Sequence, residues 1–264
     1  MRKYLHIAAV SFKAQITWRF DTLMTLLLGL FQVLMNYVLW GAIFSEREGI
    51  AGFTQGTMMA YAVASATLSR LDLSASVSAE VGARLRDGTF SRYMVLPVGP
   101  QSYFLFQTAG AAGYMLLFAA PAAALFSLLF GAAWPPLPDA GTLLAAALMT
   151  LLGLAFMAEL HFLLGVLVLR FENISVFLMI QNNLTLFLTG AMVPLMLLPA
   201  GLRAAMRLFP FYYVTYLPAM LLTGRCAGEA LPGLAVISLW LALTAALGAG
   251  IYRRLRLRYD GVGL

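Results

Sequence analysis

The chain has 264 residues, of which 62% are hydrophobic and only 11% are charged, against roughly 25% charged residues in a typical soluble domain. This composition excludes an ordinary soluble globular protein and indicates an integral membrane protein. The formal net charge of +6 is explained by basic residues beside anionic lipid headgroups, so we expect membrane lipid, and no nucleic acid, as a partner.

The first twenty residues predict an amphipathic helix that lies on the inner membrane surface. An apolar stripe recurs at helical spacing: Leu5, Ala9, Phe12, Ile16 and Phe20. Such a stripe suits the boundary between headgroups and hydrocarbon. The alternative is a frayed cytoplasmic tail. Lys13, Arg19 and Asp21 interrupt this stretch, so we expect no cleavable signal peptide.

Six stretches are candidates for membrane-spanning helices, each of which needs about 20 mostly apolar residues to cross about 30 Å of hydrocarbon. Five qualify outright: 22–44, 103–130, 142–169, 174–198 and 234–252. The sixth, 53–71, is diluted by Ser and Thr, but small residues allow membrane helices to pack closely. We therefore predict an all-α membrane protein with six spans in a single domain covering residues 1–264.

The basic residues predict the orientation of these spans. If the amino terminus is cytoplasmic, thirteen of the 17 Lys and Arg residues fall on the inner side. Only four fall outside: Arg47, Arg203, Arg207 and Arg225. Both termini are therefore expected in the cytoplasm.

A charged island at 70–92 separates the second and third spans. Val77, Val81 and Leu85 recur every four positions, which predicts a short cytoplasmic helix. Charged residues occupy its other faces: Glu80, Arg84 and Asp87. Gly88 follows as a residue that can end the helix in a left-handed conformation. The alternative is a solvated connecting loop.

The stretch 199–224 predicts short interfacial or re-entrant helices on the outer face. Pro194, Pro199 and Gly201 break the preceding helix at its outer end, and an aromatic run at 209–213 suits a membrane interface. The alternative is a plain extracellular loop. Cys226, the one cysteine of the chain, can form no intrachain disulfide.

Polar residues inside the predicted spans are candidates for function because such groups are costly in hydrocarbon. Glu159 and His161 lie two positions apart, so they point to different faces of a helix and form no prearranged pair. Glu159 either is hydrogen-bonded within the bundle or lies on a substrate or proton path. Four further polar residues are candidates: Asn36, Gln181, Asn182 and Asn183. They face a polar cavity, line the interface between protomers, or hold neighbouring helices together. For most of them we favour packing at the interface.

Two motifs resemble the permeases of ABC-2 type transporters. Residues 79–98, Ala-Glu-Val-Gly-Ala-Arg-Leu-Arg-Asp-Gly through Val-Leu-Pro-Val, resemble the segment after the second span of that family. The run Gly-Ala-Met-Val-Pro at 190–194, with Phe-Pro-Phe at 209–211, resembles its signature before the last span. The order of elements extends the resemblance over nearly the whole chain. The branch of daunorubicin-resistance and viologen exporters is the most similar.

The resemblance implies a permease subunit of an exporter in a prokaryotic cytoplasmic (inner) membrane. It would pair with a second permease and with a dimer of ATP-binding subunits that hold ATP and Mg. It assigns the coupling role to one set of residues: Glu80, Arg84, Leu85, Arg86, Asp87 and Gly88. The sequence departs from relatives at Val95-Leu-Pro, where a basic residue often precedes the proline.

The chain itself offers no motif for catalysis. A phosphate-binding loop needs Gly-Lys, but the two lysines, Lys3 and Lys13, follow Arg2 and Phe12. We therefore expect no catalytic residue, cofactor or metal in this chain. A proton-coupled secondary transporter centred on Glu159 is the alternative. A membrane-embedded enzyme is disfavoured, because there are only two histidines and no zinc-protease or nucleophile-elbow motif.

Overall fold

A computed structural model of the chain describes residues 2–46, 49–171, 174–190 and 194–256. Within these ranges the secondary structure consists of α-helices, short 3₁₀ helices and one isolated bridge between Ile50 and Phe53. The expected all-α class is confirmed for the described residues.

Four of the described helices are long and apolar enough to cross a membrane. They are α2 (Arg19–Phe44), α6 (Pro100–Leu129), α7 (Ala140–Val166) and α11 (Ala230–Leu255). A 3₁₀ turn, Leu167–Leu169, extends α7. These helices coincide with the predicted spans 22–44, 103–130, 142–169 and 234–252.

The other two predicted spans form shorter helices. Helix α3 (Gln55–Leu71) has 17 residues and α8 (Ser175–Leu188) has 14, so at about 1.5 Å per residue they are roughly 25 and 21 Å long. The apolar stretch 174–198 is thus no continuous helix. Gly190 takes a φ of +67°, and a Cβ there would lie 3.0 Å from the Leu195 side chain. The backbone turns at this glycine, and residues 191–193 of the predicted span lie outside the described residues.

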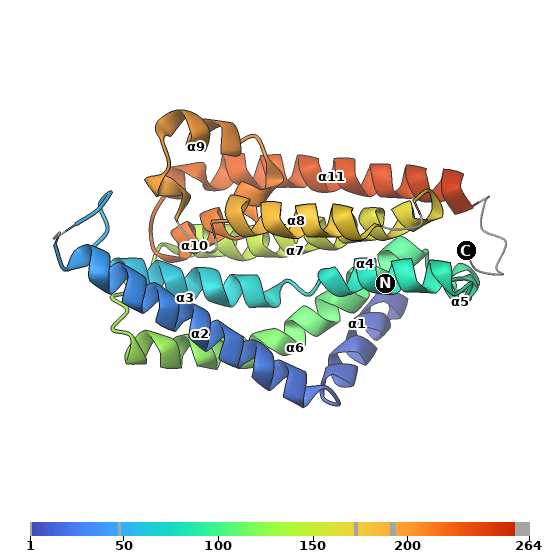
Figure 1. Cartoon of the computed structure of the whole chain (residues 1–264), viewed down its shortest axis with the longest axis horizontal. Helices are drawn as coiled ribbons and strands as arrows, with labels where there is room; N and C mark the ends of the chain where they lie inside the picture. Colours follow the sequence, from blue (N-terminus) through green and yellow to red (C-terminus); the bar gives the residue numbers. More distant parts are fainter. Residues whose placement is uncertain (1, 47–48, 172–173, 191–193, 257–264) are drawn as a thin grey trace.

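The long helices run roughly side by side between two ends of the molecule, as Figure 1 shows. We call the right-hand end in that view, where α4 (Ala75–Arg86), α5 (Ser91–Met94) and the last turns of α11 lie, the terminal end. At the opposite, distal end, Ala133 N–H donates to the Gly56 carbonyl and Arg225 donates to the Gly52 carbonyl. The start of α1 (Arg2–Gln15) also lies toward the terminal end. The charged island and both described chain ends therefore share one end of the fold.

Helix α1 runs alongside the first half of α6 and packs on it (Figure 1). Ser11 donates a hydrogen bond to the Gln107 carbonyl, and the rings of Tyr4 and Phe106 stack at 4.9 Å. A Cβ on Gly110 would collide with the Ala8 carbonyl, so only glycine permits this close approach. A helix is present where the N-terminal helix was expected, its contact with α6 is an added finding, and its place on the inner membrane surface stays a prediction.

Helix α7 is the central element, in contact with α4, α6, α10 (Tyr216–Leu222) and α11. Around its distal half lies a core rich in tyrosine and methionine. Within it the Tyr61 hydroxyl donates to the Gly190 carbonyl at 2.6 Å. The core therefore holds the break after α8 in place.

The region 199–224 forms short helices, whose interfacial or re-entrant position on the outer face stays a prediction: α9 (Ala200–Met206), a 3₁₀ turn (Pro210–Tyr213) and α10. Helix α10 is buried along most of its length, whereas Leu202 in α9 is exposed.

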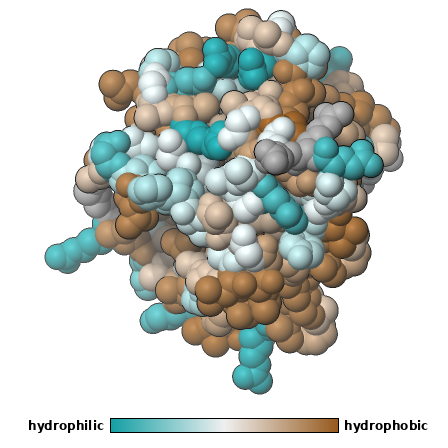
Figure 2. Space-filling model, turned by 90° about the vertical axis from the view of Figure 1, so that its left-hand side faces the viewer, coloured by the Kyte–Doolittle hydropathy of each residue, from teal (hydrophilic) through white to brown (hydrophobic). Residues whose placement is uncertain are grey.

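Viewed onto the distal end, polar side chains gather near the centre and apolar ones dominate the margins (Figure 2). This distribution suits a bundle whose flanks lie in hydrocarbon.

Candidate coupling site at the terminal end

The island between α3 and α6 folds into two helices, α4 and α5. The predicted apolar stripe of α4 is buried, since Val77 is 3% exposed and Val81 and Leu85 are 0% exposed. It packs against α7 and the 3₁₀ turn that follows α7. The segment is therefore a packed helix rather than a solvated loop.

One glycine sets the distance between α4 and α7. A Cβ on Gly165 would lie 2.8 Å from the Val81 Cβ and 3.3 Å from the Ser78 Cα. Beside this contact, the Ser78 hydroxyl lies 2.9 Å from Nδ1 of His161, also on α7. A displacement of α4 must therefore displace the terminal part of α7.

Glu80 is the hydrogen-bonding centre of the segment. Its Oε1 accepts a 2.6 Å hydrogen bond from the Tyr93 hydroxyl in α5 and lies 3.8 Å from Nε of Arg84. Its Oε2 accepts a longer, 3.5 Å hydrogen bond from Gln107 in α6. The carboxylate thus joins α4, α5 and α6, and it is largely engaged inside the protein.

The turn between α4 and α5 is built on Gly88, which has a φ of +70°. Phe90 N–H donates to the Arg84 carbonyl across this turn. The chain therefore reverses and buries the Phe90 and Tyr93 rings against Tyr252 of α11 and Phe104 of α6. Burial, followed by the hydrogen bond to Glu80, raises the pKa of Tyr93 above its ordinary value.

The exposed surface of the segment lies around this turn. Arg86, Asp87 and Arg92 are exposed, whereas the side chains of Arg84 and Glu80 are 35% and 30% exposed. Leu85 is enclosed, so of the six predicted coupling residues only Arg86 and Asp87 are fully at the surface. Val95, which follows α5, is 83% exposed.

The structure also shows functional candidates that sequence reasoning missed, namely Tyr93, Gln101 and Gln107. Gln107 and Gln101 lie in the first turns of an apolar helix, which was the available signal. Lys3 of α1 donates to the Pro97 carbonyl at 2.6 Å and so ties the N-terminal helix to the end of the segment.

Glu159 and His161 lie on different sides of α7, as their spacing predicts. Glu159 is 5% exposed and accepts a hydrogen bond from Gln101 Nε2 in α6. The same nitrogen donates to the Ala245 carbonyl in α11. His161 contacts Ser78 instead. Gln101 therefore connects three helices, and Glu159 is an internal partner of that connection.

The other polar candidates differ in their surroundings. Asn36 is buried, donates to the Gln32 carbonyl and accepts from Trp40, so it is satisfied within α2. Gln181 is 7% exposed, and its Oε1 has no hydrogen-bond donor among the described residues. Asn182 and Asn183 are exposed on α8. In the described ranges, no three His, Cys, Asp or Glu side chains gather as metal ligands would.

The fold and this site define a helical, multi-pass membrane protein in which a charged helical segment is packed onto the membrane helices. A family model described as "ABC-2 family transporter protein" matches residues 30–263. The chain therefore belongs to the ABC-2 transporter family and has a role in membrane transport. Members of this family generally work with an ATP-binding subunit and are not themselves catalytic. The searches of curated proteins and of solved structures give no match.

Proposed function

We propose that the chain is the permease subunit of an ATP-driven exporter and that the cytoplasmic helix near residues 76–88 receives the motion of a separate ATP-binding subunit. The motifs at 79–98 and 190–199 favour the branch of daunorubicin-resistance and viologen exporters. ATP and Mg would be held by the partner subunits.

One observation carries this proposal: the turn between α4 and α5 is charged and exposed, and α4 and α5 are packed against the membrane helices α6, α7 and α11. Arg86 and Asp87 lie at the surface, while Glu80 and Tyr93 hold α4 and α5 together. Docking at Arg86 and Asp87 would displace both helices as one unit. Because Val81 packs directly on Gly165, α7 would move with them.

We further propose that the single domain crosses an inner membrane six times, with the terminal end in the cytoplasm. Exposed basic residues at that end support this orientation, among them Arg86, Arg92, Arg253 and Arg254. In this topology α3 and α8 supply the two shorter crossings. Both chain termini then lie on the cytoplasmic side.

A second permease, identical or related, completes the proposed complex. Only Gln181 of α8 is buried, and large apolar side chains on α2 and α8 are exposed, including Phe31 at 58% and Phe187 at 69%. Asn182 and Asn183 lie on the same helix as Phe187. Amide groups facing lipid are costly, so a protein partner on α8 would stabilise them.

The first experiment is isolation of the chain from its native membrane in mild detergent, with identification of the proteins that remain bound. The proposal predicts recovery of an ATP-binding subunit. Variants Arg86→Ala and Asp87→Ala combined should lose that subunit, while Arg254→Ala, at the same end, should retain it. The triple variant of Glu80, Arg84 and Arg86 to Ala should also lose it. Unchanged recovery with that triple variant would overturn the coupling role.

A further inference from the structure

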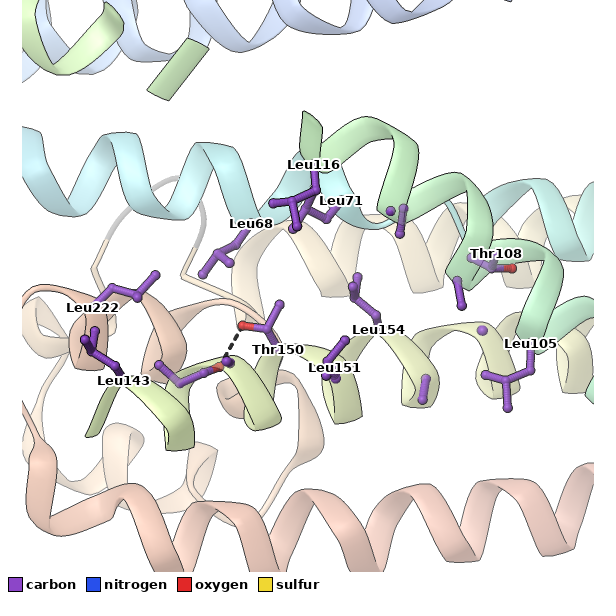
Figure 3. A pocket seen from close by; sticks show the side chains of 17 residues that line it. Leu68, Leu71, Leu105, Thr108, Leu116, Leu143, Thr150, Leu151, Leu154 and Leu222 are labelled. Carbon is purple, nitrogen blue, oxygen red and sulfur yellow. Dashed lines mark hydrogen bonds between the residues drawn. The ribbon is translucent and has the colours of Figure 1, made fainter. Parts of the chain in front are cut away.

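A lateral cavity of about 500 Å³ lies between α3, α6 and α7 and reaches Leu222 of α10. Figure 3 shows the side chains that line it, which are almost entirely hydrocarbon. Its two labelled hydroxyls are already bonded within their own helices. Thr108 donates to the Phe104 carbonyl and Thr150 to the Ala146 carbonyl. The wall therefore favours a hydrocarbon chain over a polar ligand.

The cavity opens on the flank of the bundle. Leu116 and Leu151 line it and are 48% and 63% exposed. From Leu143 to Ala158 it follows sixteen residues of α7, a rise of about 22 Å, which exceeds half of the roughly 30 Å hydrocarbon thickness. A chain from one leaflet can thus enter from the side and fill it.

A second, polar cavity of about 310 Å³ meets the first at Thr108, which lines both. It lies between α1, α6 and the α3–α4 connection, and its lining includes Gln15, Asp72 and Gln107. Thr108 therefore separates an apolar chamber from a polar one. The first suits the hydrocarbon chain of an amphiphile and the second suits its polar head.

The polar chamber offers hydrogen-bond acceptors. The Asp72 carboxylate accepts from Ser74, but no Lys, Arg or His nitrogen lies within 4.0 Å of it in the described part of the chain. The Gln107 Oε1 atom is buried and has no donor within those residues. A ligand head that carries positive charge and N–H donors complements both groups.

We propose that these two chambers bind a membrane lipid with a primary ammonium headgroup. The acyl chain occupies the cavity between α3, α6 and α7, and the ammonium group donates to Asp72 and Gln107. Such a lipid bridges α1, α3 and α6 beside the coupling segment. This site goes beyond the proposed function, because it needs no ATP-binding subunit.

The test uses the purified full-length chain and two spin-labelled lipids that share one labelled acyl chain, a phosphatidylethanolamine and a phosphatidylcholine. Choline has no N–H donor. Electron paramagnetic resonance should show roughly tenfold preferential immobilisation of the ethanolamine lipid, as one charge-assisted hydrogen bond gives. Asp72→Asn, which keeps an oxygen for Ser74, should remove this preference.

Bulky variants test the acyl-chain chamber. Ala109→Phe and Ala147→Phe, at exposed lining positions, should abolish immobilisation of both lipids, while Leu128→Phe, an exposed α6 position outside the cavity, should not. Elution of every variant at the wild-type volume in size-exclusion chromatography controls for folding. Equal immobilisation of the two lipids by the wild type, or wild-type binding by both Phe variants, would overturn the proposal and indicate nonspecific annular lipid.

Discussion

The Tyr93 hydroxyl donates a 2.6 Å hydrogen bond to Glu80, thirteen positions earlier in the chain. This bond crosses the turn at Gly88 and closes α4 and α5 into one body. Glu80 is therefore a positioning residue in the proposed mechanism, and the exposed Arg86 and Asp87 are the residues that would meet a partner.

Tyr93 should make this segment sensitive to alkaline pH. The fold raises the pKa of Tyr93, so the folded protein favours the neutral phenol. The contribution of this phenol to folding stability is fully present below the unfolded pKa of about 10. That contribution is lost as pH rises above this value. Thermal unfolding from pH 8 to 11 should show a smaller alkaline loss for Tyr93→Phe than for wild type. Identical losses would contradict the assigned hydrogen bond.

Gly165→Ala should loosen α4 from α7. The added methyl group would lie 2.8 Å from the Val81 Cβ, and such overpacking costs about 1–3 kcal/mol. Gly250→Ala is the matched control, because a Cβ there meets nothing within 4 Å in helix α11. Melting temperatures in detergent should fall for the first variant only. A wild-type melting temperature for Gly165→Ala would argue against the close contact.

Glu159 should tolerate replacement by glutamine but not by leucine. Glutamine keeps an oxygen that can accept from Gln101, whereas leucine removes it and leaves a buried donor with fewer partners, at a cost of about 1–3 kcal/mol. ATP-dependent transport in reconstituted vesicles should therefore persist in Glu159→Gln. Loss of transport in that variant, with unchanged melting temperature, would instead favour the proton-coupled transporter.

Asn183 should lie close to a second permease. In a Cys226→Ser background, Asn183→Cys should give an oxidative or bifunctional cross-link between two permease chains in native membranes. Leu128→Cys, at an exposed position of α6, serves as the control and should give none. Cross-linked permease pairs are read by gel electrophoresis and mass spectrometry. Cross-linking at Leu128 but not at Asn183 would place the interface elsewhere.

Hydrophobicity and spacing were sufficient to predict the all-α class and four of the long apolar helices. The stripe Val77, Val81 and Leu85 predicted α4 because four-residue spacing places these side chains on one helix face, and that face is buried. Pro194 was expected to break the helix at its outer end, but the span was predicted to reach residue 198, whereas α8 ends at Leu188. Gly190, within the same apolar stretch, was the signal for this earlier end.

The contacts of the candidate site were beyond sequence reasoning because they join residues far apart in the chain. Gly165 and Val81 meet across 84 positions, and Gln101 and Glu159 across 58. The charge of Glu80 predicted a surface role, yet Tyr93 and Gln107 engage it from two other helices. The packing of α4, α5, α6 and α7 in the fold brings these groups together.

The measurement that tests the central claim most directly is site-specific cross-linking from the α4–α5 turn in native membranes. A photoreactive residue at Arg86 should cross-link to an ATP-binding subunit, whereas one at Leu202, exposed at the distal end, should not. Capture of that subunit at Arg86 alone is the predicted result. No capture at Arg86, in membranes where the subunit is shown to be present, would contradict the coupling role of this segment.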